Sequence, residues 1–273
     1  MSDPTLVIDV SNLAYRALFS TSGMYYDGQP TGVLYGLLVT CRDLERRFGT
    51  TKFAFCFDTR NSRRSALCPE YKAHRAKARE EEDEERKQAR LDMYFQVQQF
   101  RELLPTWGAN NVFREDGFEA DDLIASIVRS NPKERIIIVS SDEDLWQLLE
   151  GDRVKVYRPT PKTLYTEADL LADYGVAPCQ WASVKAWAGD VSDNIVGVRG
   201  VGIKTAAKFI SGKLSKPEKL TDHVNVYNMN IQLTRLPFPK TPACWLSETT
   251  MPINWQALGE YIGSNDIDIP GVR

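Results

Sequence analysis

The chain has 273 residues, 42% of them hydrophobic and 26% charged, which is an ordinary balance for a globular protein with one large or two small domains. Its formal net charge of −3 excludes binding of nucleic acid through an overall positive field, and no apolar run or signal-peptide pattern predicts a membrane span or secretion. The 5 cysteines are scattered without a C-x-x-C pair, which argues against a zinc site or a disulfide framework and predicts a reducing cytoplasm.

Three short apolar runs predict buried strands, and helical patterns lie between them. The strands are predicted at 5–10, 52–58 and 134–142, and the helices at 31–48, 90–104 and 119–130. In the second helix, one stripe carries Met93, Val97, Phe100 and Leu104. This alternation predicts an α/β fold in which helices cover both faces of a parallel sheet.

Two further stretches differ from this pattern. Residues 60–90 are basic up to Arg79, then acidic in "EEEDEE" (80–85), and they lack apolar periodicity. We expect an exposed, partly helical excursion there; the alternative is an ordinary solvated helix with i,i+4 ion pairs. Residues 181–210 predict a helix, a glycine turn and a second helix, and 227–236 predict a last helix.

Carboxylates collect where the predicted strands end. They are Asp9, Asp58, Glu119, Asp121, Asp122, Asp142 and Asp144. In an open parallel sheet ligands bind at the carboxyl ends of the strands, so we expect these acids to converge there. Bare anions would repel one another, and an all-oxygen set suits Mg²⁺ or Mn²⁺, so the pattern favours two metal ions acting on a phosphodiester. Each acid alone is equally explained as a helix cap or a macrodipole partner.

The glycine turn "GVRGVGIKT" (197–205) is not a P-loop, because Ile203 separates Gly202 from Lys204, and it is not a Rossmann fingerprint. It offers backbone N–H groups at a helix start, with Lys204 and Lys208 alongside. We interpret it as a grip on a nucleic-acid backbone that ignores sequence; the alternative is a helical hairpin whose glycines only turn the chain.

Several stretches together resemble the 5′-nuclease superfamily of flap endonucleases, phage 5′-exonucleases and the 5′-nuclease domain of bacterial DNA polymerase I. They are "VIDVSNLAYRA", "FDTRNSRR", "PEYKAHR", "GFEADDLIA", "SSDEDLWQLL" and "GDVSDNIVGVRGVGIKTAAKFI". In order and spacing they run from residue 7 to residue 210, and they are most similar to freestanding phage or bacterial members. The last sixty or so residues lie outside the resemblance.

The resemblance implies a PIN-like nuclease core at 1–178, with a helical arch at about 60–90, and a helix–three-turn–helix region and tail at 179–273. It implies that the acids named above hold two metal ions together with Asp190 and Asp193. It also implies a monovalent cation, K⁺, on backbone carbonyls near Val198 and Val201. Lys72 and Arg75 would engage the scissile phosphate. The implied DNA contacts are Tyr71, stacking on a base, and Gly200, Gly202, Lys204, Thr205 and Lys208.

We therefore expect a monomeric, Mg²⁺- or Mn²⁺-dependent 5′-3′ exonuclease or flap endonuclease in the cytoplasm of a bacterium or of a phage-infected cell. Its expected substrates are branched or 5′-ended DNA of any sequence, and the RNA of RNA–DNA hybrids, in replication or repair. Two alternatives stay open: a non-catalytic DNA-binding protein on the same scaffold, and a PIN-type ribonuclease. One feature departs from the family pattern, because the acidic run 80–85 would repel a threaded strand unless it faces solvent.

Overall fold

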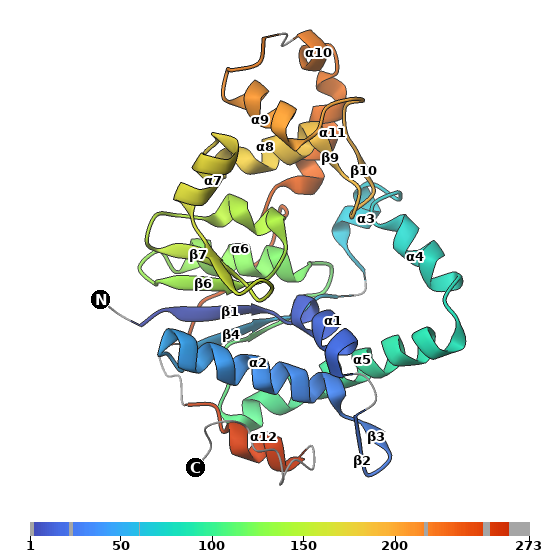
Figure 1. Cartoon of the computed structure of the whole chain (residues 1–273), viewed down its shortest axis with the longest axis vertical. Coiled ribbons are helices and arrows are strands. Elements are labelled where there is room, and N and C mark those ends of the chain that lie inside the picture. Colours follow the sequence, from blue (N-terminus) through green and yellow to red (C-terminus); the bar gives the residue numbers. More distant parts are fainter. Residues whose placement is uncertain (1–2, 22–23, 60, 216–217, 248–251, 262–273) are drawn as a thin grey trace.

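The computed structural model describes residues 3–21, 24–59, 61–215, 218–247 and 252–261, and its centre is a six-stranded sheet (Figure 1). The strand order is β5-β4-β1-β6-β7-β8, and all neighbours are parallel except β7 and β8, which makes the sheet mixed. The strands are β1 (Thr5–Asp9), β4 (Phe53–Cys56), β5 (Val112–Phe113), β6 (Ile136–Val139), β7 (Val154–Arg158) and β8 (Thr163–Tyr165). The three predicted strands correspond to β1, β4 and β6.

Helices cover both faces of the sheet, as predicted, because side chains along a central strand point alternately to either side. In β1, Leu6 and Ile8 join one apolar cluster and Val7 joins the other. The first cluster packs against α1 (Val10–Thr21), α2 (Gly32–Phe48), α5 (Glu84–Leu103), η1 (Leu104–Trp107) and α12 (Trp255–Tyr261). The second packs against α6 (Ala120–Ser130), η2 (Glu143–Leu148), α7 (Glu167–Tyr174) and α8 (Pro178–Ala188).

The predicted excursion leaves the body of the molecule, as Figure 1 shows for α4 and the start of α5. It contains α3 (Arg63–Leu67) and α4 (Ala73–Glu80), and no residue of α4 is buried. Helix α5 begins at Glu84 rather than at the predicted residue 90, because the Asp83 side chain caps it by accepting from the Arg86 N–H at 2.8 Å. The acidic run therefore ends α4 and opens α5, where negative charge complements the helix dipole. Residue 60 lies outside the described residues.

A third, smaller layer follows α8. A two-stranded hairpin, β9 (Gly189–Asp190) and β10 (Ile195–Val196), precedes α9 (Ile203–Ile210), α10 (Glu218–Thr221) and α11 (Val224–Thr234). Glycine is needed at 197, because a Cβ there would lie 2.0 Å from the Ala188 carbonyl oxygen. The second apolar cluster continues without a break from the sheet through Trp181 to Ala206. The division of the chain at residue 178 stays a prediction. The hairpin β2 (Tyr25–Tyr26) and β3 (Gln29–Pro30) follows α1 on the other side of the molecule.

After α11 the chain returns along α6 as an extended segment. The Ser126 hydroxyl donates to the Pro242 carbonyl at 2.6 Å, and the Asn131 side chain donates to the Cys244 carbonyl at 2.9 Å. These bonds attach the segment that follows the third layer to α6, which packs on the sheet. Part of the predicted tail, residues 248–251 and 262–273, lies outside the described residues.

The scattered cysteines and the lack of a long apolar run were the basis for arguing against a disulfide framework and a membrane span. All five cysteines are free thiols, and three of them, Cys41, Cys56 and Cys244, are buried. Over the described ranges, none of the helices combines the length and the apolar character that a bilayer span requires.

Candidate active site

Acids from four separate stretches of chain meet at the carboxyl edge of the sheet, as the topology predicts. Asp9 is the last residue of β1; one of its carboxylate oxygens accepts the Asn12 N–H at 3.0 Å and the other accepts the Ser140 hydroxyl at 2.8 Å. Asp58 follows β4 and accepts the Ala120 N–H at the start of α6, at 2.8 Å. These bonds orient the two carboxylates toward the gap between β1 and α6.

Electrostatic coupling shows that four of these acids lie close together. Burial, the largest cause, and the charges of Asp58 and Asp142 together raise the pKa of Asp9 to about 7. Burial also holds the pKa of Asp121 well above its usual range, together with the charges of Asp142, Asp9 and Asp58. Such mutual repulsion is what a bound cation relieves. The structure therefore brings Asp9, Asp58, Asp121 and Asp142 into one acid cluster.

A second pair of acids, Asp144 and Asp190, lies on either side of the Lys185 ammonium. The Lys185 nitrogen is 3.0 Å from Asp144 Oδ1 and 2.5 Å from Asp190 Oδ2. Burial and the Asp142 charge raise the pKa of Asp144 to about 7, whereas the Lys185 charge lowers the pKa of Asp190 despite its burial. Lys185 was not among the predicted site residues. The sequence feature that could have identified it is a lone lysine in the mainly apolar segment "WASVKAWA".

A third group joins the base of the excursion to the β9–β10 loop. The Lys72 nitrogen lies 2.9 Å from Glu119 Oε2 and 3.6 Å from Asp193 Oδ2, and Arg75 Nη2 lies 2.8 Å from Asp193 Oδ1. Although burial acts in the opposite direction, Lys72 and Arg64 lower the pKa of Glu119. The pKa of Asp193 is nevertheless raised, because its burial and the nearby Glu119 charge outweigh the two cations.

Tyr71 does not present its ring to a base in this arrangement, contrary to the expectation that it stacks. Its side chain is 4% exposed, and its hydroxyl oxygen lies 3.0 Å from both Glu119 Oε2 and Asp193 Oδ2. Desolvation of a ring packed between these acids explains why the pKa of Tyr71 is raised. Tyr71 therefore orients two carboxylates from within the protein.

Asp122, a predicted metal ligand, is engaged elsewhere. Its side chain is fully buried, and its two oxygens accept both Arg64 Nη groups at 2.7 and 2.8 Å. The same carboxylate accepts the N–H groups of Phe238 and Glu119, at 2.7 and 3.1 Å. These four bonds use the lone pairs of the carboxylate, so in this arrangement Asp122 supports the site from behind and holds no free oxygen for a metal.

The donor chemistry of the acid cluster fits a hard divalent cation. All the converging side chains are oxygen donors, which suits Mg²⁺ or Mn²⁺ better than zinc or copper. As the side chains lie, no group of three or more carboxylates, thiols or imidazoles among the described residues is arranged to hold an ion. The ammonium groups of Lys72 and Lys185 lie between carboxylates that would share a metal ion. A bound metal would therefore have to replace these ammonium groups as the partner of the carboxylates.

The glycine turn lies apart from the acids, between α8 and α9 (Figure 1). Gly200 has a positive φ of 75°, and a Cβ added at Gly200 or Gly202 would meet no other atom within 4 Å. Gly202 begins α9 without a side-chain cap, and Lys204 and Lys208 are exposed. The backbone is thus open to an anion. The Val198 carbonyl, predicted to hold K⁺, accepts the Val201 N–H at 2.9 Å.

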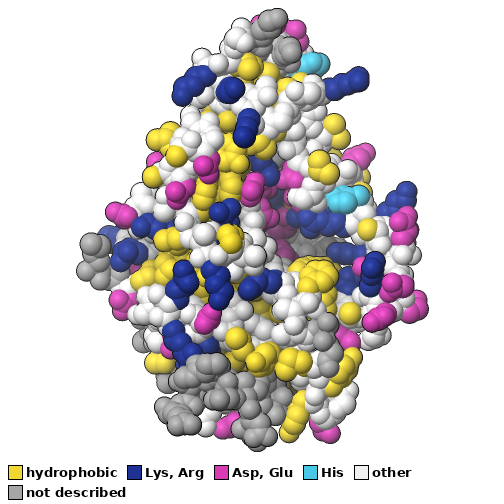
Figure 2. All heavy atoms as spheres, viewed as in Figure 1, with side chains coloured by type: hydrophobic (Ala, Val, Ile, Leu, Met, Phe, Trp, Pro, Cys, Tyr) yellow, Lys and Arg dark blue, Asp and Glu magenta, His cyan; other side chains and the backbone are white. Residues whose placement is uncertain are grey.

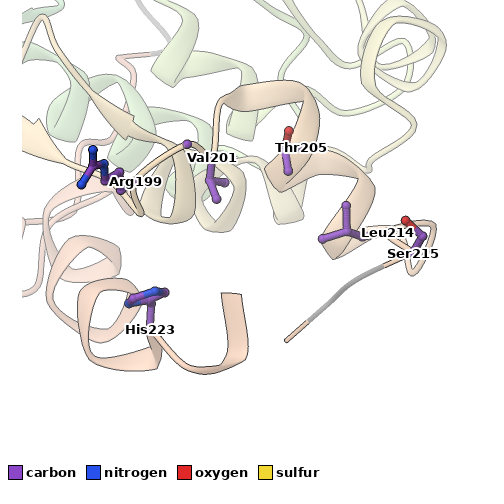
Figure 3. Close-up of a pocket in the computed structure, with 7 residues that line it drawn as sticks. Arg199, Val201, Thr205, Leu214, Ser215 and His223 are labelled. Carbon is purple, nitrogen blue, oxygen red and sulfur yellow. The ribbon is translucent and has the colours of Figure 1, made fainter. Parts of the chain in front are cut away.

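A hollow of about 480 Å³ opens beside this turn (Figure 3). Arg199, Thr205 and His223 line it from three different segments, with Val201 at the turn itself. Together with the exposed lysines, the hollow gives the third layer a basic surface that lies apart from the acids.

The sequence of the chain matches known proteins. The family model for the 5′-3′ exonuclease N-terminal resolvase-like domain matches residues 4–175. A DNA polymerase I of Mycobacterium leprae is 33% identical over 75% of this chain, which spans only 22% of that polymerase. A 5′-3′ exonuclease of Buchnera aphidicola is 28% identical over 86% of this chain and 77% of its own length.

Solved structures share the fold. The zinc-bound 5′-exonuclease of bacteriophage T5 superposes with a TM-score of 0.74 at 24% identity, over 86% of this chain and 90% of its own. A complex of the T5 flap endonuclease with DNA and metal ions gives a TM-score of 0.73 at 24% identity, over 86% and 89%. These similarities are to the mixed sheet and its flanking helices.

Proposed function

We propose that this chain, which belongs to the 5′-3′ exonuclease family, is a divalent-metal-dependent 5′-nuclease that hydrolyses phosphodiesters of DNA at 5′ flaps, junctions and 5′ ends. The observation that carries the proposal is the convergence of Asp9, Asp58, Asp121 and Asp142 at one sheet edge, beside the cations of the excursion. The relatives named as 5′-3′ exonuclease and DNA polymerase I support the same assignment.

The roles follow from chemistry at the site. Two bound Mg²⁺ or Mn²⁺ ions supply an activated water and neutralise charge on the phosphate. The acid cluster and the pair Asp144 and Asp190 would hold the ions, with Glu119 and Asp193 oriented by Tyr71. With these carboxylates engaged by metal, Lys72 and Arg75 would be free to donate to the phosphate at the foot of the excursion. The glycine turn holds duplex backbone, with K⁺ near Val198 and Val201.

Several finer expectations belong to the same proposal. They are a helix–three-turn–helix role for α8–α9, cleavage of RNA in RNA–DNA hybrids, action as a monomer and location in the cytoplasm. None of them is needed for the central claim, which concerns metal-dependent cleavage of DNA at a 5′ end or junction.

Metal removal tests the proposal. We expect end-labelled 5′-flap, nicked and blunt duplexes to be cut with Mg²⁺ or Mn²⁺ and left intact in excess EDTA. Ca²⁺ should support binding without turnover, because its looser and higher coordination places an attacking water poorly. Single-stranded RNA serves as the comparison substrate. Cleavage that persists in chelator would refute the metal assignment, and preference for the RNA would favour a ribonuclease.

Replacing Lys72 should separate chemistry from binding. We expect Lys72→Met to lower the single-turnover cleavage rate at saturating enzyme roughly 100-fold, about 2.7 kcal/mol of transition-state stabilisation, while DNA affinity changes little. Lys77→Met is the matched control, because Lys77 is an exposed lysine on α4, the helix that Lys72 immediately precedes. Rapid-quench assays and binding titrations in Ca²⁺ give the two quantities. Equal losses in rate and affinity would make Lys72 a general phosphate contact.

A further inference from the structure

A second, smaller hollow lies outside the acid cluster and the glycine turn. It has a volume of about 170 Å³ and lies between α1, α2 and the turn that joins β7 to β8. Its polar lining includes Arg16, Asp43, Arg47 and Lys162, and its floor includes the buried ring of Tyr157. Figure 2 shows dark-blue side chains gathered over these elements, on the same face as the recessed magenta acids. We call this hollow the basic pocket.

The charges of the basic pocket are unbalanced. Three cations line it against one acid, and that acid, Asp43, is paired with the Lys162 nitrogen at 3.4 Å. Arg47 is held in place because its guanidinium lies 5.0 Å above the Tyr157 ring and donates to the Lys162 carbonyl at 3.2 Å. Within the described ranges neither Arg16 nor Arg47 forms an ion pair. A guanidinium carries five N–H donors, so most of those in the pocket remain available to an anion.

One wall of the pocket, at Tyr157, lies near the carboxyl edge of the sheet, where the acids meet. Tyr157 pairs with Val139 of the next strand, and the Ser140 that follows donates to Asp9 at 2.8 Å. Tyr157 is thus two strands from Asp9, or about 10 Å at ~4.8 Å per strand. From the other wall, Arg16 follows Asp9 by seven residues of chain, about 10 Å along α1 at ~1.5 Å per residue. The two estimates agree.

That separation is meaningful for a nucleic acid. One strand of a duplex advances about 3.4 Å per nucleotide along the helix axis and also winds around that axis, so successive phosphates lie farther apart than this rise and roughly two nucleotides span the distance from Asp9 to the pocket. The volume is well below the roughly 300 Å³ at which pockets begin to take whole small molecules, so it suits a phosphate with part of its sugar rather than a nucleotide.

We propose that the basic pocket binds a backbone phosphate of the DNA substrate, roughly two nucleotides from the scissile bond, and thereby fixes where along the strand the cut falls. This inference rests on the proposed nuclease function and adds a third contact region to it. The contact is electrostatic and reads no sequence, because phosphates position a duplex and only base edges specify it. Its expected contribution is to affinity and to the position of cleavage, and the chemical step itself does not require it.

The first test compares binding of a flap duplex in Ca²⁺ by two proteins with the same change in charge. Arg47→Met/Lys162→Met removes two cations from the pocket, and Lys52→Met/Lys133→Met removes two from loops at the amino ends of β4 and β6. The pocket variant should lose roughly tenfold in affinity per contact at 0.1 M salt, and its salt slope should fall by about one unit per contact. The control should change little. Equal losses in the two proteins would overturn the pocket assignment, once thermal melts show both to be folded.

The second test locates the phosphate. Flap substrates carry one uncharged methylphosphonate linkage, moved nucleotide by nucleotide away from the cut. Wild-type protein should lose affinity at one or two positions roughly two nucleotides away, the pocket variant should not, and its cuts should spread over neighbouring positions. The scan with wild-type protein could instead show the same affinity at every position, while calorimetry shows that wild type binds inorganic phosphate and the pocket variant does not. The pocket would then take a free or terminal phosphate, and the backbone assignment would be overturned.

The two proposals fail in different ways. If wild-type protein binds the flap but never cuts it with Mg²⁺ or Mn²⁺, the nuclease function fails while the methylphosphonate scan still reports on the pocket. If wild type cuts and the scan is flat with no loss in the pocket variant, only the pocket inference fails.

Discussion

Asp142→Asn should abolish cleavage almost completely while leaving DNA binding intact. We expect the single-turnover rate to fall by roughly four orders of magnitude, about 5.4 kcal/mol of transition-state stabilisation. The substitution is nearly isosteric and keeps the oxygen that accepts the Asp144 N–H at 2.8 Å, so the start of η2 should survive. What it removes is the charge that acts on Asp9, Asp121 and Asp144 and that a cation would use. DNA affinity without added metal should persist or rise, because one anion fewer faces a polyanion.

Two variants make this expectation specific. Asp152→Asn removes an equally negative but exposed side chain, which pairs with Lys155, and it should cut normally. Lys204→Ala should show the reverse phenotype: weaker binding for every sequence alike, a salt slope reduced by about one unit and a near-normal rate at saturating enzyme. An Asp142→Asn protein that cuts at close to the wild-type rate would return the acids to the role of helix caps. A Lys204→Ala protein that is inactive at saturation would place the glycine turn inside the active site.

The centre of the sheet was predictable because its strands are buried on both faces. In β1, β4 and β6 every side chain is buried, so each reads as a continuous apolar run. The outer strands β7 and β8 were missed because polar residues such as Lys155 and Arg158 interrupt them at the edge of the sheet. Helix α1 was missed because it follows β1 directly at Val10, with no turn residue to mark the change. The first six residues of α5 were missed because they bury nothing that would produce a periodic pattern.

The convergence of the acids was predictable from the topology of the sheet. The partner of each individual acid was not, because it depends on the direction in which each side chain points. Carboxyl ends of parallel strands meet at one edge, so the convergence of Asp9, Asp58 and Asp142 follows from order along the chain. Asp121 and Asp122 are indistinguishable in sequence, yet successive helical residues point about 100° apart. One of them faces the acid cluster, and the other faces Arg64, which is 58 positions away in sequence. No local pattern identifies such a partner.

Removing one member of the buried Arg64–Asp122 pair should be strongly destabilising, although neither residue needs to touch substrate. Arg64 also donates to the Leu233 carbonyl at 2.8 Å and lies 5.0 Å from the Phe238 ring, so it joins α3, α6 and the returning C-terminal segment. Arg64→Met leaves a carboxylate buried without its counter-charge, which typically costs about 3–5 kcal/mol. In urea titrations followed by circular dichroism we expect that loss in the free energy of unfolding, and a melting temperature roughly 6–20 °C lower.

The neighbouring Arg63→Met is the control for this expectation, because Arg63 is exposed and lies against the Phe118 ring and the chain near Gly117. It should cost no more than about 1 kcal/mol. The double variant Arg64→Met/Asp122→Leu should recover much of the loss, since exchanging both members of a buried pair for apolar side chains is often neutral whereas removing one is not. If Arg64→Met were no more harmful than Arg63→Met, Asp122 would be tolerating burial without its partner. Its carboxylate would then be available to the acid cluster after all, and the second aspartate of "EADD" would return to the set of metal ligands.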